Sequence, residues 1–272
     1  MSAQPAGDGA DRTVDYQRDF YDRHYAQRAS ILREQLDHAL FADFHRRLAE
    51  RILARRPAGS GTVRIVEQAC GEGLLAAAFG DVCAAEGLEL DYLGADVSAA
   101  AAEAASRALP AGRFEAGEAV AHMAGVAEGS ADLIVAKNLL HHLVDPVALL
   151  EAGRRALAPG GRFVAVEPTR GSAQAWVFNL LAPRRERYWF VRGPQVVRGH
   201  FEAAGLRVVA EERFSFFPYE LGFTIRPGLF RRALHPEAPR AARVGEVDDR
   251  LAERVPALAN YRLWVAEEGT NR

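Results

Sequence analysis

The stretch Val63–Gly73, VRIVEQACGEG, decides which fold we expect for this chain. Its first four residues are β-branched and apolar apart from one arginine, a pattern that predicts a short buried strand. The strand ends in an acid, Glu67, and passes into a turn that contains Gly71 and Gly73. This succession is typical of the nucleotide site that an open α/β sheet forms at the carboxyl end of its first strand.

Strand and helix patterns alternate along the rest of the chain. Helical patterns cover residues 73–85, 99–108, 146–156 and 195–204. The predicted strands are Val63–Gln68, Leu88–Ala95, Gly112–Glu115, Asp132–Ala136, Gly161–Glu167, Leu206–Phe214 and Tyr261–Glu267. This alternation predicts a Rossmann-like, doubly wound α/β sheet with right-handed crossovers.

Two further parts flank or interrupt this predicted sheet domain of residues 61–272. Residues 1–60 are expected to be a disordered tail followed by an N-terminal helical lid, because residues 14–56 carry aromatic and leucine side chains at helical spacing. Leucine or phenylalanine recurs every fourth residue from Leu32 to Leu48, which predicts one buried face. Residues 215–260 are too long and too patterned for a bare loop and predict an insertion.

Composition narrows the class of protein. The 272 residues carry 34 Lys+Arg and 36 Asp+Glu, so no basic footprint for nucleic acid is expected. No apolar stretch approaches the length of a membrane span, and the N-terminus lacks the apolar core of a signal peptide. Two cysteines, Cys70 and Cys83, predict neither a disulfide framework nor a metal site. We therefore expect a cytoplasmic protein with a small-molecule substrate, and we leave a homodimer open.

Five motifs occur in order between Val63 and Pro168. They are EQACGEG at 67–73, GADVS at 94–98, GEA at 117–119, DLIV with LLHHL at 132–143, and LAPGG at 157–161. In this order they resemble the class I S-adenosylmethionine-dependent methyltransferases, specifically the small-molecule branch. The resemblance implies a seven-stranded, mostly parallel sheet with an antiparallel last strand. It also implies S-adenosyl-L-methionine as cofactor and a small-molecule acceptor from secondary metabolism.

The same resemblance implies a set of cofactor-binding residues. Asp96 follows Gly71 by about the spacing at which an acid reaches ribose hydroxyls in dinucleotide folds. Glu67 is expected to face the methionine part, directly or through water. The other expected contacts come from the lid, the turn and the later strand tips: Tyr21, Tyr25, Arg28, Ala69, Gly73, Val97, Glu118, Ala119 and Lys137. Tyr21 and Tyr25 have the alternative role of packing the lid helix onto the core.

Candidate catalytic residues follow the fourth predicted strand. His141 and His142 are candidates for a base or for positioning the acceptor, and Asn138 for orienting a polar group. Lys137, the only lysine in the chain, either binds a substrate carboxylate or points into solvent. Glu167 is expected to act as a base or to cap the following turn.

One residue departs from the pattern of the resembled family. Ala69 stands where these methyltransferases have their first glycine, and alanine resists positive φ. We therefore expect a turn conformation that suits alanine, or a slightly shifted cofactor. Two alternatives to methyl transfer stay open: cleavage or cyclisation of the cofactor with release of methylthioadenosine, and non-catalytic cofactor binding.

Overall fold

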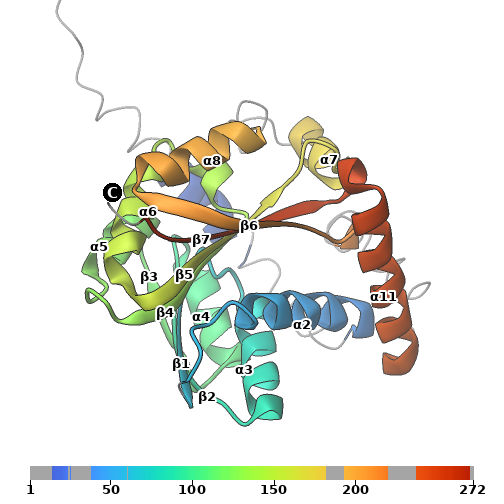
Figure 1. Cartoon of the computed structure of the whole chain (residues 1–272), viewed down its shortest axis with the longest axis horizontal. Helices are drawn as coiled ribbons and strands as arrows, with labels where there is room; N and C mark the ends of the chain where they lie inside the picture. Colours follow the sequence, from blue (N-terminus) through green and yellow to red (C-terminus); the bar gives the residue numbers. More distant parts are fainter. Residues whose placement is uncertain are drawn as a thin grey trace, which may run out of the picture.

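The computed structural model describes residues 14–23, 25, 38–59, 61–181, 193–219 and 237–269. Its centre is a seven-stranded sheet in the order β3-β2-β1-β4-β5-β7-β6 (Figure 1). The strands are β1 Thr62–Gln68, β2 Glu89–Asp96, β3 Arg113–Ala116, β4 Ala131–Lys137, β5 Leu157–Pro168, β6 Leu206–Phe214 and β7 Tyr261–Glu268. β7 pairs antiparallel with both β5 and β6, whereas the other pairings are parallel. The predicted doubly wound sheet with an antiparallel last strand is confirmed.

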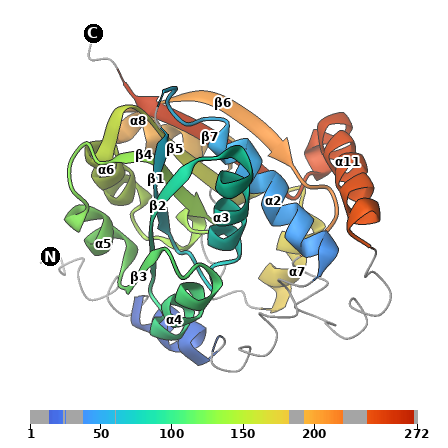
Figure 2. The ribbon, with the colours of Figure 1, turned by 90° about the horizontal axis from the view of Figure 1, so that it is seen from below.

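Helices cover both faces of the sheet (Figure 2). One face carries α2 (Ala39–Leu53) and α3 (Leu74–Glu86), with α4 (Ala99–Ala108) packed on β2, β3 and α3. The other carries α5 (Ala119–Gly125), α6 (Pro146–Ala156) and α8 (Pro194–Ala203). The remaining elements are η1 (Leu140–His142), α7 (Ala173–Leu181), α11 (Ala238–Arg254) and η2 (Pro256–Leu258). In the part of the chain that the structure describes, no helix is both long and apolar enough to cross a bilayer.

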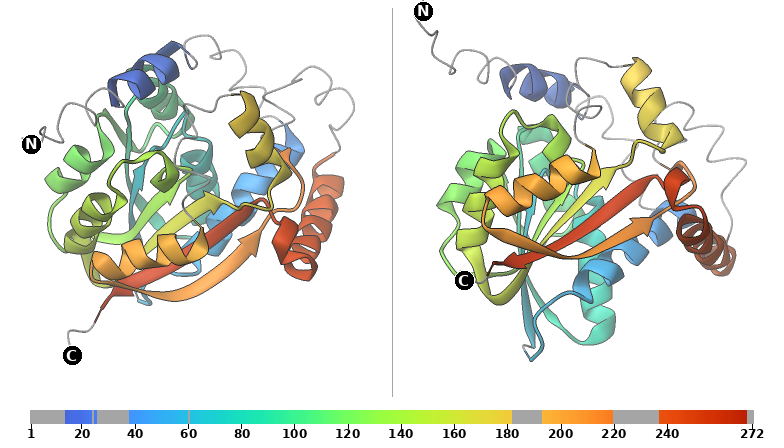
Figure 3. Two further views of the ribbon diagram at one scale, coloured as in Figure 1. Left: turned by 90° about the horizontal axis from the view of Figure 1, so that it is seen from above. Right: turned by 45° about the horizontal axis from the view of Figure 1, so that its top comes forward.

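The N-terminal helical region is not one continuous helix. Residues 14–23 are helical, and α2 begins only after His38, whose backbone is extended. The buried stripe of α2 is confirmed for Leu40, Phe44 and Leu48, while the residues of the stripe before position 38 lie outside the described residues. The helix of residues 14–23, dark blue in Figure 3, lies beside α4.

The described part of the 215–260 insertion is fastened to α2 through a buried ion-pair cluster. Arg47 donates to Asp43 at 2.8 Å, to Asp248 at 3.0 Å and to Asp249 at 2.5 Å. Asp248 is fully buried and also accepts the backbone N–H groups of residues 216–217. The cluster holds α11 against α2 at the end of the sheet, where the two helices lie side by side (Figures 1 and 2).

Removing the Arg47 cation leaves buried carboxylates without their main counter-charge. We expect Arg47→Met to lower the free energy of unfolding by about 3–5 kcal/mol. The matched control is Arg46→Met, because Arg46 pairs with Asp43 and Glu50 from a side chain that is 44% exposed. That substitution is expected to cost less than about 1 kcal/mol. Urea denaturation of both variants measures the difference, and equal losses would contradict a buried fastening of α11.

Candidate functional site

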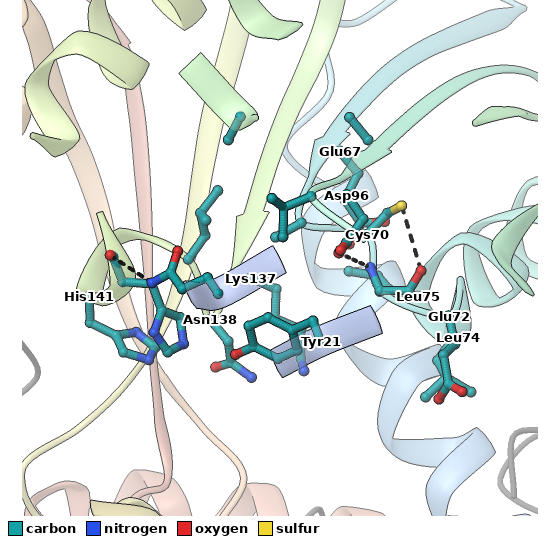
Figure 4. A pocket seen from close by; sticks show the side chains of 18 of the residues that line it. Tyr21, Glu67, Cys70, Glu72, Leu74, Leu75, Asp96, Lys137, Asn138 and His141 are labelled. Carbon is teal, nitrogen blue, oxygen red and sulfur yellow. Dashed lines mark hydrogen bonds between the residues drawn. The ribbon is translucent and has the colours of Figure 1, made fainter. Parts of the chain in front are cut away.

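A cavity of about 300 Å³ opens along the carboxyl edge of the sheet (Figure 4). In this view Asn138 and His141 lie on one side, Asp96 and Cys70 on the other, and Tyr21 lies between them. The cavity brings together the predicted residues Tyr21, Tyr25, Glu67, Ala69, Gly71, Asp96, Val97, Glu118, Ala119, Lys137, Asn138, His141 and His142. Arg28 lies outside the described residues.

Asp96 joins the turn after β1 to the start of α4. One carboxylate oxygen accepts the backbone N–H of Gly71 at 2.9 Å and the other accepts that of Ser98 at 3.0 Å. The Ser98 hydroxyl in turn caps α4 and donates to Asp22 at 2.5 Å, which ties the helix of residues 14–23 to the same point. Burial raises the pKa of Asp96 to about 6, while the two N–H donors oppose the rise.

The turn after β1 keeps a left-handed conformation at its alanine. Ala69 has φ +58°, so the expectation of a conformation suited to alanine is wrong. For a residue with a Cβ this conformation costs about 1–2 kcal/mol. Gly71 also has positive φ, and a Cβ there would lie 3.2 Å from the Tyr25 hydroxyl oxygen. The Tyr25 hydroxyl therefore packs closely against the turn. Favourable packing elsewhere in the fold compensates the conformational cost at Ala69.

Gly73 serves helix packing and does not line the cavity. A Cβ at this position would lie 2.7 Å from the Cα of Ala105 in α4, and its φ is +80°. Its glycine character thus allows α3 and α4 to approach each other closely. Gly73 was expected among the cofactor contacts, but it is not among the residues that line the cavity.

Glu67 ends β1 as a buried carboxyl group. It accepts a hydrogen bond from the Tyr92 hydroxyl, and it is 2% exposed. Burial raises its pKa to about 8, an effect opposed by the Tyr92 hydrogen bond and by the charge of Lys137. Glu67 and Asp96 thus stand at the tips of neighbouring strands in different protonation regimes near neutral pH.

Glu167 fixes the loop that carries His141. One of its oxygens accepts the N–H groups of Leu139 and Leu140 at 3.0 and 2.9 Å. The other lies 3.3 Å from the N–H of His141 and 2.5 Å from the Nδ1 of the same residue. A carboxylate that accepts these bonds holds Nδ1 as the N–H donor, so Nε2 carries the ring's lone pair. The expected capping of the turn that follows Glu167 is wrong, because its carboxylate instead holds the loop after β4; its expected role as a base stays a prediction.

Aromatic rings connect the lid helix to the His141–His142 pair. The two histidine rings lie 4.0 Å apart between centroids, and Tyr21 meets His142 edge-on at 6.4 Å. Tyr21 also stacks on Tyr25 at 5.9 Å, and Gln17 donates to the backbone oxygen of His142 at 3.1 Å. The helix of residues 14–23 therefore covers the cavity from the side opposite the sheet, and both expected tyrosines line it.

Glu118 and Ala119, which were expected beside the cofactor, lie at the start of α5. Glu118 caps α5 by accepting the N–H of Ala121 at 2.8 Å, and Ala119 begins that helix. With Glu67, Glu72 and Asp96, Glu118 gives the cavity four lining carboxyl groups. Acidic walls suit a ligand that combines a sulfonium, an ammonium and ribose hydroxyls. The residues present therefore fit the expected cofactor.

Several lining residues were not predicted from the sequence. Phe41 and His45 come from α2, Gln174 from α7 and Tyr261 from the start of β7. The i, i+4 spacing of Phe41 and His45 beside the buried stripe was the available signal. The sequence also predicts an acceptor pocket formed by the aromatic residues between Trp176 and Phe190 together with the 215–260 insertion. Trp176 is 53% exposed, and none of the described residues of 215–260 lines the cavity; residues 182–190 lie outside the described part.

Metal ligands are not grouped in the described ranges. No cluster of three or more His, Cys, Asp or Glu side chains there has an arrangement that could hold an ion.

Replacing Ala69 by glycine should relieve the strain in the turn. We expect Ala69→Gly to raise the free energy of unfolding by about 1 kcal/mol, because glycine adopts positive φ without a Cβ clash. Ala84→Gly, at an exposed right-handed position of α3, is expected to lower it by about 1 kcal/mol. Paired urea titrations test the contrast; destabilisation by both substitutions would show that the left-handed backbone at Ala69 carries no strain.

Comparison with known proteins places this geometry in a family. The family model described as a methyltransferase domain matches residues 32–211, well over half of the chain. A search among curated proteins finds no match.

Three solved structures with the same fold are 16–18% identical to the chain. One solved structure is the complex between the Haloferax volcanii Trm112 methyltransferase activator and the putative methyltransferase. The matching chain is 18% identical, with 94% of this chain and 98% of that chain covered and a TM-score of 0.56. The [4+2]-cyclase SpnF is 16% identical, with 83% and 81% covered and a TM-score of 0.55. Geranyl diphosphate C-methyltransferase from Streptomyces coelicolor A3(2) is 16% identical, with 81% and 78% covered and a TM-score of 0.53. The chain belongs to the methyltransferase-domain family, whose cofactor is S-adenosylmethionine.

Proposed function

We propose that this protein transfers the methyl group of S-adenosylmethionine to a small-molecule acceptor. The observation that carries the proposal is the shared cavity, in which Asp96 and a histidine oriented by Glu167 face the same space. Asp96 offers carboxylate oxygens to ribose hydroxyls, and His141 offers the lone pair of Nε2 to an acceptor proton.

The protein's own groups supply binding, alignment and proton removal. When bound, S-adenosylmethionine supplies an electrophilic methyl group on a sulfonium that departs as a neutral thioether. Glu167 holds the ring of His141 through Nδ1, so the ring presents Nε2 in one tautomer. His141 then accepts the proton that the acceptor loses as the new bond to carbon forms. Tyr21 and Tyr25, on the covering helix, exclude water and align the reactants.

A small acceptor is favoured over a macromolecule by charge and by coverage. The formal net charge of the chain is −2, and the helix of residues 14–23 contributes Val14, Gln17 and Tyr21 to the cavity lining. The solved geranyl diphosphate methyltransferase, which acts on a small molecule, has the same fold. These features support a metabolite acceptor over RNA or DNA.

A second candidate keeps the cofactor and changes the reaction. The likeness to SpnF, named as a [4+2]-cyclase, supports the view that this fold also hosts chemistry other than methyl transfer. In that candidate the protein cleaves or cyclises the cofactor itself and releases methylthioadenosine.

Product analysis separates the two candidates. Purified protein is incubated with S-adenosylmethionine alone and then with a panel of small acceptors. Methyl transfer predicts S-adenosylhomocysteine only when an acceptor is present; methylthioadenosine formed without an acceptor would overturn it. With an acceptor found, His141→Ala should lower kcat by about 10²–10⁴-fold with little change in cofactor affinity. His200→Ala, on α8 and away from the cavity, is the control and should keep kcat.

The raised pKa of Asp96 predicts a pH dependence of cofactor binding. Because protonation removes the negative charge and turns one acceptor oxygen into a donor, affinity should fall by up to about tenfold per pH unit below pH 6. The same raised pKa means that ionised Asp96 opposes folding, so its unfavourable contribution to stability grows as the pH rises from about 4 to 6. Titration calorimetry with S-adenosylhomocysteine between pH 5 and 8 measures the affinity.

Asp96→Asn supplies the control for this titration. The variant should bind more weakly by about 1.5–3 kcal/mol and lose the step near pH 6, because its amide does not titrate. Any step near pH 8 that reflects Glu67 should remain. A step near pH 6 that persists in Asp96→Asn would assign the titration to another group.

A further inference from the structure

The helix of residues 14–23 is attached to both walls of the cavity. Near its start, Gln17 donates from Nε2 to the backbone oxygen of His142 at 3.1 Å. Near its end, Asp22 accepts a hydrogen bond from the Ser98 hydroxyl at 2.5 Å. Side chains at helical spacing between these contacts line the cavity: Val14, Gln17 and Tyr21. The helix therefore bridges the loop after β4 and the start of α4.

Ser98 joins this helix to Asp96. Its backbone N–H donates to one Asp96 oxygen at 3.0 Å, and its hydroxyl donates to Asp22. The hydroxyl oxygen also accepts the N–H of Ala101 at 3.2 Å, which caps α4. Because a hydroxyl has one proton, the cap uses the oxygen and the contact to Asp22 uses the proton. Removing the Asp22 carboxylate therefore leaves the cap of α4 and the hydrogen bond from Ser98 to Asp96 in place.

Two carboxylates thus lie against one serine, and their charges repel each other. Burial raises the pKa of Asp96 to about 6, and the charge of Asp22 adds to that rise. In the described ranges no arginine or lysine forms an ion pair with either acid. The other ionisable groups on which Asp96 acts carry no positive charge: Tyr25, Glu67 and Cys70. These neighbours therefore do not offset the repulsion between Asp22 and Asp96.

Linkage makes this repulsion reciprocal. Because the charge of Asp22 disfavours the ionised form of Asp96, ionised Asp96 disfavours docking of Asp22 by the same free energy. Ribose hydroxyls that donate to the Asp96 carboxylate offset part of its negative charge. A ligand bound at Asp96 therefore strengthens the contact between Asp22 and Ser98.

Resting on the proposed cofactor site, we propose that Asp22 is a positioning residue that couples docking of the helix of residues 14–23 to occupation of the ribose site at Asp96. Before the cofactor binds, repulsion between the two carboxylates across Ser98 keeps the helix weakly docked. A bound nucleoside lowers that repulsion, and the helix then closes over the reactants. The helix releases again before S-adenosylhomocysteine leaves.

Tryptic cleavage after Arg18 and Arg23 measures this docking, because both arginines lie in the helix and the Arg18 side chain is 45% exposed. The full-length protein is digested at pH 8 with and without saturating S-adenosylhomocysteine, and mass spectrometry follows both cuts. S-Adenosylhomocysteine should slow cleavage by about tenfold or more in the unaltered protein. Asp22→Ala should reduce this protection to about twofold or less. The matched control is Asp19→Ala, an exposed acid of the same helix, which should keep the protection.

Asp22→Asn separates the charge of this residue from its hydrogen bond. The amide oxygen still accepts from the Ser98 hydroxyl, but it lacks the charge that repels Asp96. Without ligand, this variant should be cleaved several-fold more slowly than the unaltered protein, and S-adenosylhomocysteine should add little protection. A hydrogen bond with no role for repulsion predicts the opposite order, since a carboxylate is the stronger acceptor.

Two results would overturn the coupling: protection in Asp22→Ala equal to that in Asp19→Ala, or faster cleavage of Asp22→Asn than of the unaltered protein without ligand. Calorimetry on the same samples records binding of S-adenosylhomocysteine independently. Binding without protection overturns the role of Asp22 and leaves the cofactor site standing. Absence of binding overturns the cofactor site itself, and the coupling with it.

Discussion

The carboxylate of Asp96 is the contact on which the rest of the site depends. Its two oxygens hold the N–H of Gly71, in the turn after β1, and that of Ser98, at the start of α4. Through the Ser98 hydroxyl the same point reaches Asp22 on the covering helix. Three segments far apart in sequence are thus joined at one buried acid, and burial raises its pKa to about 6. A group held this way is already oriented before a ligand arrives, which reduces the cost of binding.

A second carboxylate organises the opposite wall in a similar way. Glu167, at the end of β5, accepts hydrogen bonds from the backbone N–H groups of Leu139 and Leu140 and from Nδ1 of His141. Because β4 and β5 are neighbours, the strand pairing itself brings this acid beneath the loop that follows β4. The two acids therefore hold different parts of the cavity wall. Asp96 fixes the turn after β1 and the start of α4, and Glu167 fixes the ring of His141. The Arg47 cluster, outside the cavity, fastens α11 at the end of the sheet and leaves the site to the strand tips and the covering helices.

Local patterns were sufficient for the sheet and for the acids at the ends of its strands. β1 is rich in β-branched residues, β2 begins with acidic and apolar residues in alternation, and each strand carries an acid at or near its end. These are local signals, so β1, β2 and their acids Glu67 and Asp96 were predictable. The part of the cavity lined by Gln174 and Tyr261 was not predictable, because Tyr261 reaches the cavity only when β7 inserts between β5 and β6, and tertiary packing determines that insertion. Ala69 shows the converse: its local preference is against positive φ, and the surrounding turn overrides it.

The central claim is that the cofactor lies between Asp96 and the His141 wall of one cavity. A crystal structure of the complex with S-adenosylhomocysteine tests it most directly. The expected result is that the ribose hydroxyls donate hydrogen bonds to the Asp96 carboxylate and that the sulfur faces the space in front of His141. The nucleoside bound elsewhere, or bound with Asp96 engaged only by Gly71 and Ser98, would contradict it.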